Sequence, residues 1–284
     1  MYWKSAHFFF YFTPFRIKSP NKLEVKAERK TLLDSWRFYD PKGPIPGDRS
    51  IPGIGMPGSG SDFQRFITYL GIPVIDMKLE SAPIYTYMLY HTMYEIPWFL
   101  DNFVDENYDA LSAVGQLWLE IGRDLADSLI IPFNLHDYGL ALADFISKMD
   151  QQLEHIGIPN AIGFRAYRLV LSNLRGALKR FQVVADVVQE IIQHVEQAFI
   201  AEQGIYDERP EYRHLIFSSS SYNEYGNFPF AGILDPALNW RNAFVAGDSQ
   251  KADYWLKIVR IGFSKLHYAI ESATLTITMD GFYD

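Results

Sequence analysis

The stretch LVLSNLRGALKRFQVVADVVQEIIQHVEQAF, residues 169–199, decides the fold class of this 284-residue chain. Its apolar residues recur every three or four positions, which places them on one face of an α-helix. The members of this stripe are Leu169, Leu174, Leu178, Phe181, Val184, Val188, Ile191, Ile192, Val195 and Phe199. A stripe of that length predicts a helix over roughly residues 161–200.

Three further segments, at about 108–129, 136–156 and 249–276, carry the same helical periodicity. Proline at 132 ends the first of them, because proline cannot continue a helix and restrains the residue before it. Four helices that can pack side by side predict a bundle. The connection over 204–247 is rich in Tyr, Ser, Asn, Gly and Pro, and a loop of that length is usually functional or disordered.

The region before these helices carries α/β signals. Asp62–Leu70 has the spacing of a short helix, and Gly71–Met77 has the composition of a short buried strand. One helix and one strand cannot form a sheet, so we expect this region to be the end of a larger α/β domain. Residues 1–30 are predicted to be a poorly specified leader that need not belong to the fold.

The composition excludes several classes of protein. With 48% apolar and 16% aromatic residues the chain is globular, and its net charge of -8 argues against nucleic acid as a partner. The absence of cysteine from the sequence excludes disulfides, Cys-ligated zinc and thiol nucleophiles, without fixing the compartment. The sequence contains no run of 18 apolar residues, which a transmembrane helix would need. The N-terminus lacks the features of a clear signal peptide.

The dipeptide Tyr90-His91 is the leading candidate for chemistry. Neutral imidazole is the commonest zinc ligand in proteins, and a tyrosine hydroxyl can donate to a developing oxyanion. The alternative is a structural histidine in a tyrosine-rich turn. The other histidines considered, at 136, 155, 194, 214 and 267, lack metal-ligand spacing and are predicted to be polar surface or capping residues.

The loop Gly58-Ser59-Gly60-Ser61 could bring backbone groups close to a ligand, since glycine permits such an approach. The alternative is a helix-entry loop in which Ser61 or Asp62 is the N-cap. The acidic clusters at 101–109 and 120–127 are predicted to be solvated helix faces. The mixed aromatic, hydroxyl and charged residues of 209–225 favour ligand contact over packing.

Taken in order, these motifs resemble the C-terminal part of the glutamate carboxypeptidase II family, zinc exopeptidases related to transferrin receptor. The series covers about residues 31–276. It comprises Gly58–Phe63, Leu70–Pro73, Tyr90–Glu95, Leu125–Ser128, Ile131–Phe133, Asp137–Tyr138, Glu196–Phe199, Tyr212–His214, Ser219–Tyr225, Phe228–Pro229 and Gly232–Ile233. The resemblance implies the C-terminal part of a two-zinc α/β peptidase domain over 31–132, and a mainly α-helical, four-helix-bundle-like dimerisation domain over 133–284.

The resemblance also implies roles for individual residues. His91 matches the last zinc-ligand position, and Tyr90 matches a tyrosine that stabilises the tetrahedral intermediate. The substrate-binding positions are Ser59, Gly60 and Ser61 in the groove loop, and Asn223 and Tyr225 in the segment that reaches the pocket for the substrate's terminal carboxylate. Glu224 stands where the family has a pocket lysine, so we do not expect a preference for a C-terminal glutamate.

In the family, the other zinc ligands and the glutamate general base precede this region. Because one histidine cannot hold two zinc ions, we expect no zinc to bind to this chain alone, and peptide substrate only if the rest of a peptidase domain is supplied. The first hypothesis is therefore a truncated zinc exopeptidase that is not catalytic by itself. The alternative is a non-catalytic dimerisation or receptor-like module. Both predict a homodimer through the helical domain, and family members are typically membrane-anchored with an extracellular or luminal ectodomain.

Overall fold

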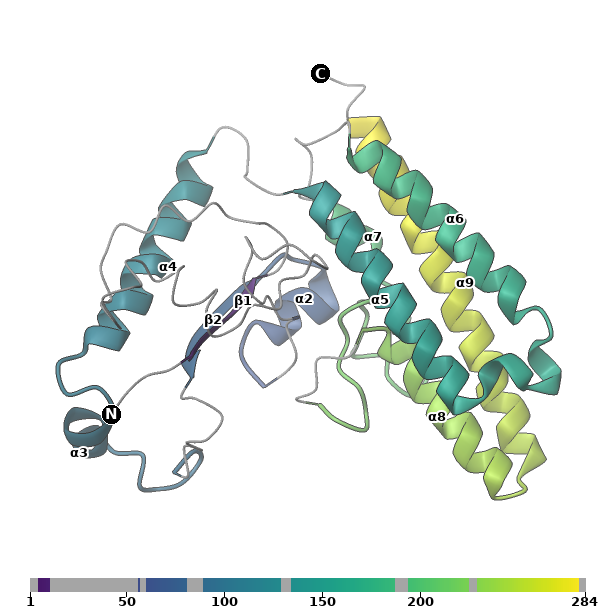
Figure 1. Cartoon of the computed structure of the whole chain (residues 1–284), viewed down its shortest axis with the longest axis horizontal. Coiled ribbons are helices and arrows are strands. Elements are labelled where there is room, and N and C mark those ends of the chain that lie inside the picture. Colours follow the sequence, from purple (N-terminus) through teal and green to yellow (C-terminus); the bar gives the residue numbers. More distant parts are fainter. Residues whose placement is uncertain are drawn as a thin grey trace. The chain divides into compact units, whose positions relative to one another are not determined.

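The computed structural model describes residues 5–10, 56, 60–80, 89–128, 134–186, 194–224 and 229–280 (Figure 1). The chain divides into two compact units. Unit 1 comprises Met1–Phe10, Pro14–Gly55 and Ile75–Pro132, and unit 2 comprises Tyr11–Thr13, Met56–Val74 and Phe133–Asp284. Most of the described residues are helical, in agreement with the helical domain predicted from the sequence.

Unit 2 is built on four packed helices: α5 (Leu135–Ile156), α6 (Tyr167–Ala185), α8 (Ala231–Val245) and α9 (Ser249–Asp280). The long α9 lies against both α8 and α6, and α5 packs on α6 and α8 (Figure 1). The four are not those that the periodicity indicated. The predicted helix over 108–129 belongs to unit 1, and α8 completes the group in unit 2.

The ends of α5 follow from its flanking residues. The Asn134 side chain accepts hydrogen bonds from the backbone N–H groups of His136 and Asp137, which satisfies donors at the first turn. Gly157 ends the helix at a φ of 99°, a left-handed conformation that glycine adopts without strain. Between these caps one face of the helix is buried, through residues such as Leu142, Ile146 and Leu153.

The prediction of one helix over 161–200 was wrong. The helix α6 ends at Ala185, and only the single turn α7 (Val195–Ala198) follows among the described residues. After that turn Ile200 forms an isolated β-bridge with His214, and the Phe199 carbonyl accepts from the N–H of Leu215. The N–H groups of Phe199 and Ile200 still donate to the carbonyls of Glu196 and Gln197, but the Phe199 carbonyl already bonds to a distant segment, so the helix does not continue.

The prediction of a long connection over 204–247 was also wrong in part, because the helix α8 occupies Ala231–Val245. Two features hide this helix in the sequence: it contains Pro236, and it is buried on most sides, so it lacks an apolar stripe with a polar opposite face. Helices α8 and α9 approach closely at Gly262, where a Cβ atom would lie 2.9 Å from the Gly232 carbonyl oxygen.

Residues 60–74 pack within unit 2, although the sequence analysis placed them in the α/β domain. The helix α2 (Gln64–Leu70) buries Ile67 completely, and the Thr68 carbonyl accepts from the N–H groups of Arg213 and His214. Gly71 caps this helix at a φ of 65°, and a Cβ there would lie 2.8 Å from the Ile200 side chain. The division of the chain at residues 132 and 133 stays a prediction.

Unit 1 contains a two-stranded antiparallel sheet, with β1 (Ser5–Phe10) paired to β2 (Ile75–Glu80) so that Phe10 lies opposite Ile75. The expectation that residues 1–30 lie outside the fold therefore fails for Ser5–Phe10. The strand predicted at 71–77 begins later, because Gly71 and Pro73 still belong to the exit from α2. This one described sheet does not establish a larger α/β domain.

The helical part of unit 1 comprises α3 (Pro97–Phe99), a π-helical turn (Leu100–Val104) and α4 (Asp109–Asp127). Asp105 is buried, and its carboxylate accepts from the N–H groups of Ala110 and Leu111 at the start of α4. This corrects the solvated-face prediction for Asp105. Within the described ranges of both units, no helix combines the length and apolar character that crossing a membrane requires.

Candidate functional site: a pocket beside a hydrogen-bonded serine loop

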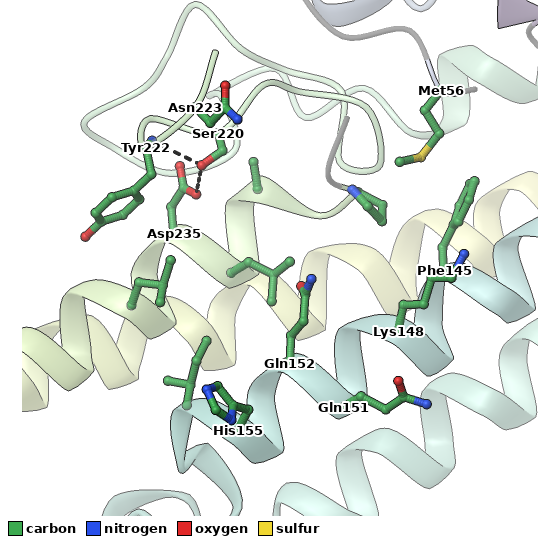
Figure 2. Close-up of a pocket in the computed structure, with 15 residues that line it drawn as sticks. Met56, Phe145, Lys148, Gln151, Gln152, His155, Ser220, Tyr222, Asn223 and Asp235 are labelled. Atoms are coloured by element: carbon green, nitrogen blue, oxygen red, sulfur yellow. Dashed lines mark hydrogen bonds between the residues drawn. The ribbon is translucent and has the colours of Figure 1, made fainter. Parts of the chain in front are cut away.

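Unit 2 contains a pocket of about 620 Å³ between α5, the start of α8 and the loop over residues 218–224 (Figure 2). Its wall is largely apolar, with a few polar groups that converge from three segments. The lining residues are Met56, Phe145, Lys148, Gln151, Gln152, His155, Ile156, Ser220, Tyr222, Asn223, Pro229, Ala231, Leu234, Asp235 and Leu238. An apolar cavity with a small number of polar groups is the usual composition of a ligand site.

Asp235 fixes the serine loop against α8. Its buried carboxylate accepts from the Ser220 hydroxyl at 2.6 Å, the Ser221 N–H at 2.6 Å and the Ser221 hydroxyl at 2.8 Å. The Ser220 hydroxyl in turn accepts from the Tyr222 N–H at 3.1 Å, as Figure 2 shows. Because each donor belongs to the segment directly before Asn223, the carboxylate sets the path by which that residue reaches the pocket.

Arg209 completes this network from the other side of the loop. Its side chain is buried, and Nη1 donates to the Ser219 carbonyl at 2.8 Å while lying 3.6 Å from the Asp235 carboxylate. The guanidinium group also lies over the Tyr212 ring, 3.9 Å from its centroid. A buried carboxylate is costly without a cation and donors nearby, and this arrangement supplies both. Burial, and then the Asp235 charge, raise the pKa of the neighbouring Tyr206.

A second buried polar cluster joins α7 to the start of the same loop. His214 Nε2 lies 2.7 Å from the Glu196 carboxylate, and His214 Nδ1 accepts from the N–H groups of Ile216 and Phe217. Since Nδ1 is an acceptor, the proton lies on Nε2 and is donated to Glu196. Burial, followed by the Glu196 charge, raises the pKa of Tyr138 well above its usual value. The prediction of a surface or capping role for His214 was therefore wrong.

Tyr90 and His91 lie in a turn of unit 1. Their rings stack at 3.9 Å between centroids, and both residues are exposed. His91 has a φ of 62°, and its backbone N–H donates to the Glu95 carboxylate at 2.8 Å. The N–H bond to Glu95 holds this otherwise unfavourable conformation in place. The proposed catalytic and metal roles of this pair stay predictions.

The remaining predicted site residues lie in unit 2 or outside the described residues. Gly60 adopts a φ of 92° and precedes Ser61, whose carbonyl accepts from the Gln64 N–H at the entry to α2. This supports the helix-entry reading of the loop, but α2 has no side-chain N-cap. Asn223 lies in the pocket wall, whereas Ser59 and Tyr225 lie outside the described residues.

The described residues do not by themselves form a two-zinc centre. Among them, no group of three or more His, Cys, Asp or Glu side chains converges as metal ligands would. Asp235 and the α5 residues of the pocket were not predicted from the sequence. One signal was present for Asp235, because it is an acidic residue within the otherwise apolar run Gly232–Ala237.

Comparison with known families places a recognised domain on these helices. The model of the transferrin receptor-like dimerisation domain matches residues 178–271, from the second half of α6 to most of α9. The match therefore includes α8, the serine loop and Asp235.

Comparison with individual proteins gives the same grouping. The chain is 29% identical over 252 residues to a glutamate carboxypeptidase 2 homolog of Caenorhabditis elegans, covering 79% of this chain and 32% of that protein. It is 27% identical over 218 residues to a probable glutamate carboxypeptidase of Arabidopsis thaliana, covering 74% and 30%. It is 22% identical over 238 residues to an inactive zinc metalloprotease of Schizosaccharomyces pombe, covering 75% and 28%.

The chain thus spans about a third of the length of the relatives that it matches. The order of motifs, the domain match and the relatives agree with one another. The resemblance inferred from the sequence is confirmed: residues 178–271 match the transferrin receptor-like dimerisation domain, and the chain is similar to glutamate carboxypeptidase homologues over about three quarters of its length.

Proposed function

We propose that this chain contributes the dimerising helical domain of a glutamate carboxypeptidase-like zinc exopeptidase, and that it is not catalytic by itself. The observation that carries this proposal is the match of the dimerisation domain to residues 178–271, which lie on the well-packed helices of unit 2. The share of the relatives that the chain covers is consistent with a role as one part of such a protein.

In this proposal unit 1 corresponds to the end of the peptidase domain. His91 then supplies one zinc ligand and Tyr90 stabilises the tetrahedral intermediate, while a two-zinc centre also needs carboxylates and a second histidine from elsewhere. Ser59, Gly60 and Ser61 line the substrate groove. Asn223, at the end of the loop that Asp235 holds, and Tyr225 contribute to the substrate pocket from the helical domain.

The second candidate function is a dimerisation or receptor-like module without peptidase chemistry. It is favoured by the similarity to a relative that is named as an inactive metalloprotease. Under this reading the serine loop and the pocket beside α5 serve an interaction, and the Tyr90-His91 turn has no catalytic role.

Three measurements on the purified chain test the proposal. Sedimentation velocity at micromolar concentration is expected to give a dimer, elemental analysis to give far less than one zinc per chain, and dipeptide assays to give no hydrolysis. A monomer would contradict the dimerisation role. Stoichiometric zinc together with hydrolysis that His91→Ala abolishes would show that the chain is catalytic by itself.

A protein that joins this chain to the family's remaining zinc ligands would separate the two candidate functions. If such a protein hydrolyses peptides, and His91→Ala abolishes that hydrolysis, the exopeptidase reading is supported. If it retains the dimer but neither binds zinc nor hydrolyses peptides, the non-catalytic module is supported instead.

A further inference from the structure

Helices α6 and α9 expose apolar residues at intervals of seven along one side of each helix. On α9 they are Tyr254, Ile261, Tyr268 and Leu275, and on α6 they are Leu169 and Val183 with Gly176 between them. The largest exposed fractions are 75% for Tyr268, 64% for Leu169 and 61% for Leu275. A seven-residue spacing keeps side chains nearly in line along a helix, and such a line is the seam of a coiled coil.

The two lines lie on the same side of unit 2. Arg180 pairs with Glu271 across the two helices. Arg180 is one turn from both Gly176 and Val183, and Glu271 is one turn from both Tyr268 and Leu275. The ion pair therefore joins the two lines and places them on either side of one groove. We refer to Leu169, Gly176 and Val183 of α6 with Ile261, Tyr268 and Leu275 of α9 as the α6–α9 face.

The two helices also run in the same direction. The Phe263 ring lies 5.9 Å and 6.0 Å from the rings of Phe164 and Tyr167 at the start of α6, and Glu271 lies beside Arg180 near its end. From Tyr254 to Leu275 the line on α9 is about 30 Å long at 1.5 Å per residue. Figure 1 shows the later part of α9 extending alongside α6, and its first part lying beside α8.

We propose that the α6–α9 face is the surface on which a second copy of this chain docks, with the two copies of α9 antiparallel. The proposal rests on the homodimer proposed above and names its interface. Two parallel helices related to their copies by a two-fold axis form a four-helix layer with an apolar seam, and a face used by both copies must be complementary to itself.

Charge favours this occupant. Arg180 and Glu271 already pair with each other at the centre of the face, and the exposed Lys179 and Lys257 flank it as cations. An antiparallel overlap that sets Ile261 opposite Tyr268 of the second copy also sets Lys257 beside Glu271 of that copy. Lys257 and Glu271 lie at opposite ends of the overlap, so they pair with each other between two copies of α9 only when the copies are antiparallel.

The domain match supports the same location, because residues 178–271 include Val183, Ile261 and Tyr268. Another exposed apolar pair of unit 2, Phe244 and Val245, lies at the end of α8 and covers a single turn. A patch of that length cannot form a seam of several heptads. Val245, at 78% exposed, therefore provides a matched control for charge substitutions on the α6–α9 face.

The first test replaces an apolar residue of the face with a charged one. Tyr268→Glu and Leu275→Glu are expected to weaken the dimer by tenfold or more in sedimentation equilibrium, because central aromatic and aliphatic contacts dominate interface energies. Val245→Glu is expected to leave the dissociation constant unchanged. Far-UV circular dichroism and the unfolding midpoint of each variant establish that it remains folded.

The second test uses the absence of cysteine from the sequence, which makes single cysteine variants free of side reactions with other thiols. Pairing Ile261 with Tyr268 of the second copy places the two-fold axis between residues 264 and 265 of α9. The two copies of residue 264 then lie close together, so Ser264→Cys is expected to form a disulfide-linked dimer under mild oxidation. Gln250→Cys, on the same side of α9, would have its partner about 40 Å away and is expected to remain unlinked. Linkage of both variants would contradict the antiparallel arrangement and indicate a parallel one.

The outcomes separate this inference from the proposed function. A wild-type monomer would overturn the homodimer itself. A wild-type dimer that Tyr268→Glu and Leu275→Glu leave intact, without linkage of Ser264→Cys, would retain the homodimer and overturn the α6–α9 face. Loss of the dimer on Val245→Glu alone would place the interface at the end of α8.

Discussion

The two units of the chain differ in how they bury their apolar residues. In unit 2, α5 alone buries a continuous face from Leu135 to Ile156, and the core continues through α6, α8 and α9. In unit 1, α4 has 19 residues, of which only Leu117 and Ile121 are buried apolar residues, while Trp118 is 65% exposed. Similar helical periodicity in the sequence therefore corresponds to very different burial.

The comparison shows what hydrophobic periodicity measures. A stripe of apolar residues states that a helix has a side suited to burial, but it does not state whether another element covers that side. In unit 2 the helices cover one another. Unit 1 thus owes less of its stability to its described apolar residues, and the substitutions below test this difference.

The largest effect is expected in the core of unit 2. Phe181 is fully buried, with its ring 5.8 Å from that of Tyr138, so Phe181→Ala removes a large side chain from a closed environment. We expect a loss of about 3–5 kcal/mol in the free energy of unfolding, measured by urea denaturation. The matched substitution in unit 1, Trp118→Ala, is expected to change it by less than about 0.5 kcal/mol. Equal losses would contradict the comparison.

A slightly smaller effect is expected from the buried carboxylate beside the pocket. Asp235→Ala leaves the donors of Ser220 and Ser221 and the charge of Arg209 without their acceptor, at an expected cost of about 3 kcal/mol. Limited proteolysis should also cut the 218–224 loop faster than in the wild type. The exposed carboxylate of Asp127, at the end of α4, is the control, and Asp127→Ala should alter neither stability nor cleavage.

A hydroxyl in unit 2 provides a pH-dependent test. The Tyr167 hydroxyl donates to Asp150 at 2.6 Å, and burial followed by this bond raises the pKa of Tyr167 above that of a free tyrosine. A raised pKa in the folded state contributes stability that is fully present below the unfolded pKa of about 10 and is lost as the pH rises above it. Tyr167→Phe should cost about 1–2 kcal/mol at pH 8.

The difference between wild type and Tyr167→Phe should therefore shrink as the pH of the unfolding experiment rises above 10. In unit 1, hydrogen bonding to Asp101 raises the pKa of the exposed Tyr108 in the same direction. Because that tyrosine is exposed, Tyr108→Phe is expected to have a smaller effect than Tyr167→Phe at every pH. A larger effect of Tyr108→Phe than of Tyr167→Phe would show that burial does not decide how much each tyrosine contributes to stability.

The smallest effect has the opposite sign. Gly115 and Gly122 lie inside α4, and a Cβ atom at either position would meet no neighbouring atom within 4 Å. Replacing either with alanine should stabilise α4 by about 0.5–1 kcal/mol, measured as slower hydrogen exchange of its amides. Gly163→Ala in unit 2 should not stabilise, because its Cβ would lie 2.6 Å from the Leu256 side chain.

The sequence was sufficient where the end of an element is set by its own residues. The predicted helix at 136–156 differs from α5 by one residue, because the Asn134 cap and Gly157 both act within a few residues of the ends. The predicted helix at 249–276 likewise begins where α9 begins. In these cases the signals are local and do not depend on what the helix packs against.

The sequence was insufficient where distant residues decide. The prediction of one helix over 161–200 missed the end of α6 at Ala185 and the bridge between Ile200 and His214, which the apolar periodicity does not show. Helix α8 was missed because its first half, Ala231–Ala237, is buried on every side and has no polar face. The buried pairing of His214 with Glu196 depends on the same bridge. In the candidate site Asn223 was identified by resemblance, whereas its support by Asp235 required the structure.

The contacts of α2 have a consequence for the order in which unit 2 forms during synthesis. Gln64 bonds to Tyr212, 148 residues later in the chain, and the Thr68 carbonyl bonds to Arg213 and His214. At about 5–20 residues per second, a ribosome takes roughly 7–30 seconds to synthesise that interval. Gln64 and Thr68 therefore lack these partners for that time, so α2 completes its contacts with unit 2 only after residues 212–214 have emerged.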